Sequence, residues 1–467
     1  MPRLILSPRG ARPTPAAPRA RWLWDPRTTP LRSPVLLALG LAALILAGTL
    51  LLLLPISARE GRADVVVALF TATSAVTVTG LVVVDTRTYW SPFGQAIILA
   101  LFQFGGLGFM LGVTALGLLL RGRLSIKQRV IVQEIGVGPS LGGQSRLVRN
   151  TFLFTFGSEA VGILLLWPRF ASEYGVGRGL WLAVFHGVSA FTNAGFDVFG
   201  DSLVGFRADP FVLLTVAALI VLGALSLVVV GDVWRHRRWS RLSLDSKIVL
   251  LGTAVLLVGA TVITLITERA NPASIGGLPA GLRLLNAFFA AASRTAGFVT
   301  WDFAASDQRT TFFFLGLMFV GGAPGSMAGG IKITTAVLIL AGVWSTLRGR
   351  PDATLLERRL PPSQLAQAHA VVILALALVA NMALAISLLD GARLLAPFLS
   401  LLFEVTSAFG TVGFSAGVTP QLSTPGRVLL ILTMFAGRLG PITVALTLVA
   451  RRQRQPYRRI SEGVRIG

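Results

Sequence analysis

Four short segments with polar side chains and a central glycine interrupt the long apolar stretches of this chain. The central residues are Gly80, Gly195, Gly297 and Gly413, which are 115, 102 and 116 residues apart. Near-regular recurrence at this length indicates one structural unit used four times. Glycine permits backbone conformations with positive φ, which can turn a carbonyl oxygen toward a cation. We therefore predict that the four segments meet in a ring of backbone carbonyls around an ion path.

The tips of the predicted ring contain uncharged polar residues and no carboxylate. Carbonyl oxygens that replace the water around an ion suit a monovalent cation better than a ring of acids would. The positions expected to line this selectivity filter are Thr79, Gly80, Asn193, Ala194, Gly195, Thr295, Ala296, Gly297, Thr411, Val412 and Gly413. The alternative is four ordinary turns between packed helices, and the common register of the four segments argues against it.

The composition places the chain among integral membrane proteins. Apolar residues make up 54% of its 467 residues, charged residues make up 13%, and the mean hydropathy is +0.74. Stretches of about 20 apolar residues, the length that spans a bilayer, recur along the chain. Cysteine is absent, only three histidines occur, and no cluster of His, Asp and Glu or of Ser and Lys is visible. We therefore expect neither an enzyme nor a cofactor held by this chain.

The formal charge of +22 is distributed as in a membrane protein rather than a nucleic-acid-binding protein. Basic clusters follow apolar stretches, and acidic residues occupy the alternate loops. The basic clusters are Arg121, Arg123, Lys127 and Arg129; Arg235, Arg237, Arg238 and Arg241; Arg348, Arg350, Arg358 and Arg359; and Arg451, Arg452, Arg454, Arg458 and Arg459. Cytoplasmic loops carry such an excess of Lys and Arg. The pattern predicts a multi-pass protein of the cell membrane, in contact with lipid, with both termini in the cytoplasm.

Each repeat is predicted to contain a spanning helix, a short pore helix, a loop and a second spanning helix. The first helices cover residues 33–54, 149–167, 245–266 and 365–389, the short helices 62–74, 178–190, 278–292 and 392–408, and the last helices 92–120, 210–233, 310–347 and 426–450. The short helices fall below the length of about 20 residues that a span needs. The predicted fold class is all-α integral membrane, with four pseudo-symmetric helix–pore-helix–loop–helix repeats around a central pore, eight spans and four re-entrant half-helices.

The domain boundaries follow from this pattern. A cytoplasmic N-terminus rich in Pro and Ala, expected to be disordered, covers residues 1–32, and a cytoplasmic tail covers residues 451–467. The pore repeats occupy residues 33–120, 121–233 with a preceding cytoplasmic loop, 234–347 with a glycine-rich break, and 348–450. Half-helices that point inward aim their partly negative C-terminal ends at the axis, which favours a cation there.

The last helix of repeat three contains the sequence Gly-Gly-Ala-Pro-Gly-Ser-Met-Ala-Gly-Gly-Ile-Lys at residues 321–332. This much glycine around a proline cannot sustain a regular helix. A soft break beside a pore is a candidate gate, and the alternative is a small-residue face for close helix packing. The predicted gate residues are Gly321, Gly322, Gly325, Ser326, Gly329, Gly330, Lys332 and Arg438.

Four charged residues lie within or beside the predicted helices. Arg438 lies in the apolar last helix, where a charge needs water or a partner. It would act as an electrostatic barrier in a cation path, and the alternative is a side chain that snorkels to the inner interface. Arg294 and Glu404, assigned to the outer ends of short helices, are expected to brace the filter through the backbone or through each other. A direct cation site at Glu404 is an alternative, and Glu159 has no motif around it.

With these motifs, the chain from residue 33 to its end resembles the membrane subunit, of the Ktr type, of the Ktr/Trk/HKT superfamily of potassium transporters. The resemblance rests on Ser-Ala before the glycine in repeats one, two and four, Arg-Thr-Ala-Gly-Phe at 294–298, the segment 321–332 and Gly-Arg-Leu-Gly-Pro at 437–441. It implies a K⁺ site at each of Gly80, Gly195, Gly297 and Gly413. It implies K⁺ rather than Na⁺ permeation, because Gly80 stands where some Na⁺-favouring members have Ser. It also implies a gating loop in which Met327 replaces the usual Thr or Ser.

The resemblance further implies partners and a function. The family pairs this subunit, as a homodimer, with a cytosolic ring of nucleotide-binding (RCK-type) regulatory subunits, and Gly467 matches the terminal Gly of the Ktr type. The basic loops 121–129 and 235–241 are candidate docking surfaces. The expected function is K⁺ uptake through a channel-like, K⁺-selective pore, with Na⁺ as a further candidate transported or activating ion. The alternative is a secondary cation transporter that works by alternating access, which predicts buried carboxylates in mid-span.

Overall fold

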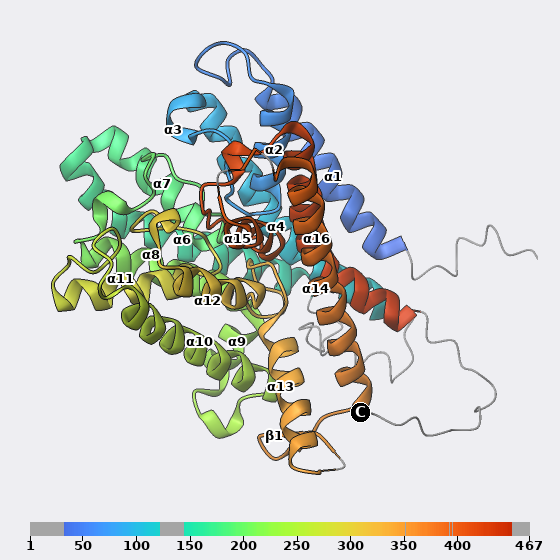
Figure 1. The fold of residues 1–467 in the computed structure, drawn as a ribbon. Helices are drawn as coiled ribbons and strands as arrows, with labels where there is room; N and C mark the ends of the chain where they lie inside the picture. The colour runs from blue at the N-terminus through green and yellow to red at the C-terminus, as the bar shows by residue number, and fades with distance from the viewer. Residues whose placement is uncertain (1–31, 122–143, 351, 392, 395, 451–467) are drawn as a thin grey trace, which may run out of the picture.

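The computed structural model describes residues 32–121, 144–350, 352–391, 393–394 and 396–450, and this part of the chain is built almost entirely of helices (Figure 1). The sheet in the described ranges is one antiparallel hairpin of β1 (Thr354–Leu355) and β2 (Arg358–Arg359). Several predicted features lie outside the described residues: nearly all of the N-terminal segment, the basic residues Arg123, Lys127 and Arg129, and the tail with Gly467.

Three helices in the described ranges are long and apolar enough to cross a bilayer, and a bent pair of helices supplies a fourth candidate. The three are α6 (Gln144–Tyr174), α10 (Leu244–Glu268) and α14 (Pro362–Asp390), at positions where spanning helices were expected. The protein itself buries only 28%, 28% and 22% of their apolar windows. Apolar side chains that point outward suit a lipid solvent, so the fold is that of a helical membrane protein.

The other helices alternate between long and short. The long helices α1 (Arg32–Leu52), α4 (Pro92–Arg121) and α16 (Thr424–Ala450) coincide with predicted spans. The short helices are α2 (Val65–Val76), α7 (Val176–Thr192), α11 (Ala280–Ser293) and α15 (Phe398–Gly410), and their C-terminal ends are buried. Single turns at α3 (Thr86–Tyr89), η1 (Val204–Phe206), η2 (Trp239–Arg241), η3 (Phe303–Ala305) and η4 (Thr419–Gln421) complete the connections.

Contacts between the helices follow a closed order (Figure 1). Each short helix packs on the long helix before it: α2 on α1, α7 on α6, α11 on α10 and α15 on α14. The helix after each short helix packs on the next short helix: α4 on α7, α8 (Pro210–Ala224) on α11, α12 (Gln308–Phe319) on α15, and α16 on α2. Because the last contact returns to α2, the long helices enclose the ends of the short ones.

Three of the short helices end in the same hydrogen-bonding motif. After α7, Asn193 adopts the left-handed conformation (φ 59°), and the next amide donates to the carbonyl oxygen of Ser189 at 2.8 Å. Val78 and Thr411 occupy the same position after α2 and α15. This Schellman arrangement reverses the chain at the end of each helix and leads it into the glycine segment. The end of α11 differs, because Arg294 keeps a right-handed conformation.

The prediction of one unbroken spanning helix over residues 210–233 is wrong. Helix α8 ends at Ala224, and α9 (Leu227–His236) continues at an angle of 97°. Ser226 caps α9 by accepting a hydrogen bond from the amide of Val229 at 3.3 Å. At the break, the carbonyl oxygens of Gly223 and Ala224 accept hydrogen bonds from amides near residue 325. A partner about 100 residues away therefore stabilises the break, which explains why an apolar sequence does not reveal it.

The predicted break in the last helix of repeat three is present. Helix α12 ends at Phe319, α13 (Ile333–Leu347) begins after Lys332, and the residues between them form no regular helix. Five residues between 320 and 332 are glycine, and Pro324 lies among them. The local sequence alone therefore accounts for the interruption of the helix.

Carboxylates tie the end of one helix to the start of another. Glu268, at the end of α10, accepts a hydrogen bond from the amide that precedes α12 at 2.8 Å. Asp390, at the end of α14, accepts one from the amide that precedes α16 at 3.1 Å. Asp209 caps α8 and binds the guanidinium of Arg169 on α6 at 2.6 Å. The connections between these helices are thus held by specific acceptors.

Candidate ion pathway

The four predicted glycines lie in one ring of mutually contacting loops. A Cβ atom added to each glycine would overlap the carbonyl oxygen of the residue that precedes the next glycine around the ring. The pairs are Gly80 with Ala194, Gly195 with Ala296, Gly297 with Val412, and Gly413 with Thr79. The last pair closes the circle. The neighbouring loop at each position therefore leaves no room for a side chain.

The backbone of each ring glycine imposes a second constraint. All four have positive φ, with values of 85°, 71°, 72° and 97° in chain order. An L-residue in the left-handed region costs about 1–2 kcal/mol, whereas glycine adopts it freely. Glycine is therefore required at these positions both by its own conformation and by the contact with the next loop.

Polar side chains around the ring hold the loops in place. Thr295 Oγ1 donates to Asn193 Oδ1 at 2.8 Å and so joins the second loop to the third. Ser189 Oγ donates to a carbonyl beyond the glycine at 2.8 Å, and Ser407 Oγ accepts from the amide of Gly413 at 3.1 Å. In loops two and four, the serine of the Ser-Ala motif thus links the end of the short helix to the glycine segment.

Three further glycines, absent from the predicted site, lie on the long helices against the ends of the short helices. Gly105 on α4, Gly223 on α8 and Gly437 on α16 face carbonyl oxygens of Val76, Phe191 and Phe409, which a Cβ atom would overlap. They follow their ring glycines by 25, 28 and 24 residues, and this recurring interval was available in the sequence. In repeat three an interval of 24 residues leads to Gly321, where the break begins.

Residues 320–332, here called the gating segment because the sequence predicts a gate there, form a loop closed at its base. The amide of Gly321 donates to the carbonyl of Ile331 at 2.7 Å, and Val320 and Ile331 form a parallel bridge. The amides of Ala323 and Met327 donate to the carbonyl oxygens at the end of α8, at 2.9 and 3.0 Å. Because Met327 is held through its backbone, this position requires no side-chain hydroxyl.

The gating segment touches the ring of glycine loops. A Cβ atom at Gly329 would overlap Thr411 Oγ1, so the segment packs directly against loop four. Met327 Sδ lies 3.2 Å from where a Cβ of Gly106 on α4 would stand. Together with the bonds to α8, these contacts place the segment between α4, the α8–α9 break and the fourth loop.

Two of the predicted gate residues have cationic side chains, and both side chains donate hydrogen bonds to carbonyl oxygens of the gating segment. Arg438 is 1% exposed, and its Nη1 donates to the carbonyl of Met327 at 2.6 Å. Lys332 is buried, and its Nζ donates to the carbonyl of Ala328 at 2.6 Å. Because the Arg438 side chain is enclosed and directed at the segment, the alternative that it snorkels to the inner interface is wrong.

Arg294 and Glu404 do not pair with each other, contrary to one of the two expectations. The buried guanidinium of Arg294 donates to the carbonyls of Val320 and Gly321, where α12 ends and the gating segment begins. Arg294 lies at the buried C-terminal end of α11, next to the third glycine loop. An arginine there satisfies carbonyl groups that lose their helical partners when α12 stops.

Glu404 is enclosed by donors from the segment that follows the fourth loop. Its carboxylate accepts from the amides of Ala416 at 2.9 Å and Thr419 at 3.0 Å, from Ser415 Oγ at 2.7 Å, and from the Thr419 hydroxyl. Four donors on one buried carboxylate match a structural role better than a cation site, because they occupy its acceptor positions.

We expect Glu404→Gln to destabilise the protein by about 2–3 kcal/mol. The glutamine has one acceptor oxygen, and its NH₂ group would face amide and hydroxyl donors. The measurement is the thermal melting of the purified protein in detergent, followed by tryptophan fluorescence. Gln308→Glu, an exposed change at the start of α12, is the control and should melt like the unchanged protein. Equal melting of Glu404→Gln would contradict the structural role.

Glu159 forms a buried polar pair between α4 and α6. Gln103 Nε2 donates to Glu159 Oε2 at 3.1 Å, and Glu159 is 3% exposed. Within the described residues, the other oxygen of each side chain and the hydroxyl of Thr155 have no hydrogen-bond partner. The hydrogen bond of this pair joins α4 to α6 and includes no residue of the ring or of the gating segment.

In this helical membrane protein, buried glycine loops without helical structure meet in a closed ring. This arrangement is typical of the class of proteins that pass small ions through their interior. The sequence model of a protein family described as "TrkH: Cation transport protein" matches residues 41–456 of this chain. The chain is a member of this family of cation transport proteins.

Three characterised relatives are similar over most of their length. The chain is 39% identical to Ktr system potassium uptake protein B of Bacillus subtilis (strain 168), covering 90% of this chain and 94% of the relative. It is 36% identical to the protein of the same name from Vibrio alginolyticus, covering 89% and 91%. It is 34% identical to the potassium/sodium uptake protein NtpJ of Enterococcus hirae, covering 93% and 97%.

A solved structure has a similar fold. The potassium transporter TrkH from Vibrio parahaemolyticus superimposes with a TM-score of 0.72, over 91% of this chain and 87% of that one. At 18% sequence identity, this likeness concerns the fold alone.

Proposed function

We propose that this protein takes up potassium across the cell membrane through a channel-like, K⁺-selective pore. The observation that carries the proposal is the closed ring of four positive-φ glycines, each packed against a carbonyl oxygen of the next loop. The names of the relatives agree, since they are described as potassium or potassium/sodium uptake proteins.

The pore is built from four helix–pore-helix–loop–helix repeats, with boundaries at residues 33–120, 121–233, 234–347 and 348–450. The closed order of helix contacts supports this arrangement, as do the three Schellman motifs at matching positions. The protein crosses the membrane eight times, with both termini in the cytoplasm and four re-entrant half-helices. The bent pair α8 and α9 counts as one span.

K⁺ sheds its water in the ring and binds near Gly80, Gly195, Gly297 and Gly413. Backbone carbonyls of the ring and its flanking residues replace the hydration shell. The C-terminal ends of the half-helices add partial negative charge. A negative-inside potential contributes about 2.3 kcal/mol per charge for each 100 mV, which is enough to drive uptake without a cofactor. Na⁺ is a further candidate as a transported or activating ion.

The gating segment closes the exit beneath the ring. Its contacts with loop four and with the α8–α9 break support this role. Arg438 tethers the segment through Met327 and adds a positive charge on the path of a cation, and Lys332 adds a second. Opening then requires the segment to leave the carbonyls of α8 and the guanidinium of Arg438.

The protein works as a homodimer with a cytosolic ring of nucleotide-binding regulatory subunits. Two relatives are named as parts of a "Ktr system", which supports a further subunit. The basic residues at the end of α9 and after it are a candidate docking surface: Arg235, Arg237, Arg238 and Arg241. Because α9 begins at the break that binds the gating segment, a partner there would act on the gate directly.

The test of this function is ⁸⁶Rb⁺ flux into liposomes that contain the pure protein, with K⁺ and Na⁺ as competitors. We expect uptake that follows an imposed negative-inside potential and that K⁺ inhibits far more strongly than Na⁺. Uptake equal to that of protein-free liposomes, with the protein shown to be folded by its melting curve, would refute the proposal.

We expect Gly80→Ser to lower the K⁺/Na⁺ selectivity ratio by roughly tenfold. The new side chain would overlap Ala194 O and strain a backbone at φ 85°, so the ring must widen at this loop. A change of about 1.4 kcal/mol in the binding free energy of K⁺ relative to Na⁺ corresponds to this factor. The measurement is competition of K⁺ and Na⁺ with ⁸⁶Rb⁺ uptake. Gly61→Ser is the control, because Gly61 also has positive φ (79°) but no neighbour within 4 Å. An unchanged ratio in Gly80→Ser would argue against the ring as the filter.

Glu159→Gln separates the pore from the alternative of a coupled transporter. We expect this change to leave ⁸⁶Rb⁺ uptake within about twofold, because the Glu159–Gln103 pair lies off the ring and an amide is nearly the same size. A transporter that moves protons or ions by alternating access would use such a buried carboxylate, and loss of uptake in a normally folded variant would favour that mechanism.

A further inference from the structure

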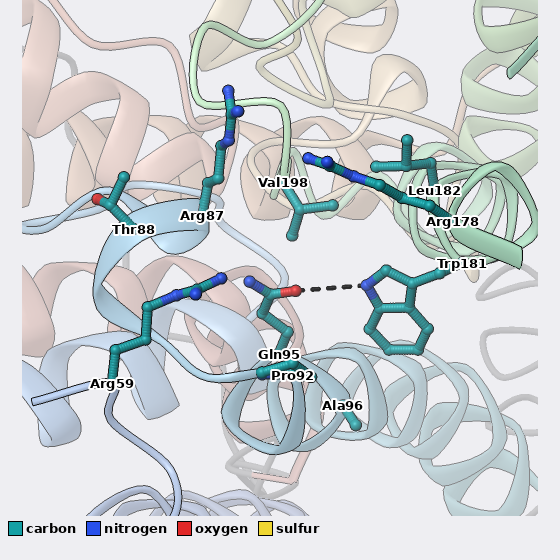
Figure 2. Close-up of a pocket in the computed structure, with 10 residues that line it drawn as sticks. All are labelled: Arg59, Arg87, Thr88, Pro92, Gln95, Ala96, Arg178, Trp181, Leu182 and Val198. Atoms are coloured by element: carbon teal, nitrogen blue, oxygen red, sulfur yellow. Dashed lines mark hydrogen bonds between the residues drawn. The ribbon is translucent and has the colours of Figure 1, made fainter. Parts of the chain in front are cut away.

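A cavity of about 670 Å³ lies between α3, the start of α4 and the start of α7 (Figure 2). Three arginines line it from separate elements: Arg59 from the connection after α1, Arg87 from α3, and Arg178 from the first turn of α7. In Figure 2, the side chain of Arg59 lies to the left of Gln95, that of Arg178 comes in from the upper right, and that of Arg87 lies at the top. The volume lies within the range of about 300–1,000 Å³ typical of ligand sites.

No Asp or Glu side chain is among the residues that line this cavity, although Asp85 lies beside Arg87. In the described parts of the chain, no ion pair includes Arg59, Arg87 or Arg178, although Arg169 and Arg309 each bind a neighbouring aspartate. Arg87 Nη1 donates to the carbonyl of Phe199 at 2.6 Å, and Arg178 lies 5.6 Å from the ring centre of Tyr174. Asp85, beside Arg87, instead accepts from the amide and hydroxyl of the turn it caps.

The rest of the cavity wall is apolar or already hydrogen-bonded. Pro92, Ala96 and Leu182 line it, and Trp181 Nε1 donates to Gln95 Oε1 at 3.3 Å, the dashed line in Figure 2. Gln95 Nε2 is also used, because it donates to two backbone carbonyls nearby. The groups left to bind a ligand are therefore guanidinium donors beside an apolar surface. Such a surface suits an amphiphilic anion.

The position of the cavity favours a lipid. It lies at the ends of α4 and α7 that the proposed topology places at the outer membrane surface, and Trp181, a residue type enriched at membrane interfaces, lines it. Arginine without a carboxylate partner is unusual on that side, since positive residues normally gather in the cytoplasmic loops. Guanidinium groups bind phosphate with directed, charge-assisted hydrogen bonds.

We propose that this arginine pocket binds the phosphate headgroup of an anionic phospholipid of the outer leaflet, with an acyl chain along the wall of Trp181 and Leu182. The site borders the second loop of the pore, because Val198 lines the cavity and Arg87 holds the carbonyl of Phe199. A bound lipid would therefore steady the residues that follow Gly195. The inference uses the proposed topology but not the proposed ion selectivity.

The test is the melting temperature of the delipidated full chain in detergent, titrated with dioleoylphosphatidylglycerol, dioleoylphosphatidylcholine or inorganic phosphate. We expect phosphatidylglycerol to raise the melting temperature saturably, and the other two to have little effect. The variant is Arg59→Gln/Arg178→Gln, which spares Arg87 because its guanidinium holds the backbone of the pore loop. Removing two arginines should weaken the apparent affinity by roughly 25-fold, about fivefold for each.

The control is Arg62→Gln, an exposed arginine of the same connection that does not line the cavity, and it should bind phosphatidylglycerol like the unchanged chain. An equal response of the double variant would place the lipid elsewhere and overturn the proposal. A response to inorganic phosphate alone would overturn it in favour of a soluble anion. If the double variant unfolds in detergent, the same titration is performed on Arg59→Gln and Arg178→Gln separately. Failure here with intact ⁸⁶Rb⁺ flux would leave the proposed function standing.

Discussion

Uptake of ⁸⁶Rb⁺ is expected to fall by roughly 100-fold when Gly195 is replaced by alanine. The added Cβ would overlap the carbonyl oxygen of Ala296, and the residue would have to keep φ at 71°. The left-handed conformation alone costs about 1–2 kcal/mol for alanine, and relief of the overlap must move the third loop. A ring that has opened at one contact no longer offers a complete set of carbonyls to an ion without water.

The matched control is Gly259→Ala on α10, where a Cβ would meet nothing within 4 Å. It makes the same chemical change at a position with open space, so its flux should equal that of the unchanged protein. Both variants are compared at equal amounts of protein in the liposomes, with melting curves to confirm folding. If Gly195→Ala conducts as well as the control, the ring of glycine loops is not the ion path.

The second large effect has the opposite sign: Arg438→Gln should raise ⁸⁶Rb⁺ flux by roughly tenfold. A unit charge at about 8 Å from a passing cation costs about 2 kcal/mol at an effective dielectric constant of about 20. The substitution removes that charge and also weakens the bond to the carbonyl of Met327, which we propose holds the segment closed. Both effects act in the same direction, because a freer segment and a less positive exit favour passage of a cation.

Arg427→Gln is the control for charge on the same helix, because Arg427 is near the start of α16 and donates to the carbonyl of Pro420 instead. Deletion of residues 321–330 should raise flux as well, since it removes the closed loop beneath the ring. Uptake is measured in a strain that lacks its own K⁺ transport and in liposomes. Lower or unchanged flux in both Arg438→Gln and the deletion, at normal expression, would show that the segment is not a gate.

Much of the fold was predictable because its signals are local. The four short helices, the long helices before them and the break after Phe319 lie within a few residues of their expected positions. Each depends on features that act over one turn or one span: apolar length, proline, and glycine that cannot support a helix. The break between α8 and α9 was missed for the complementary reason, since it is stabilised by amides of the distant gating segment.

The residues of the candidate site also fall into two groups, those that the sequence predicts and those whose role appears only in the structure. Gly80, Gly195, Gly297 and Gly413 could be selected from the sequence, because a glycine that recurs in a polar tip indicates a backbone conformation that only glycine adopts freely. The roles of Arg294 and Glu404 could not be read from it. Arg294 contacts carbonyls at the end of α12, and Glu404 contacts the segment after its own loop. Both contacts join a buried charged side chain to donors or acceptors that come close to it only when the helices have packed.

The sequence by itself determined that the chain is a helical membrane protein, that four glycine segments recur within it, and that the third repeat contains a broken helix. These properties follow from composition and from backbone preferences, which each residue carries wherever it lies. Only the tertiary structure decided which carbonyl faces each glycine, that the gating segment rests on loop four and on α8, and that three arginines share one cavity. Those contacts join residues up to about 330 positions apart, so they exist only once packing has brought the segments together.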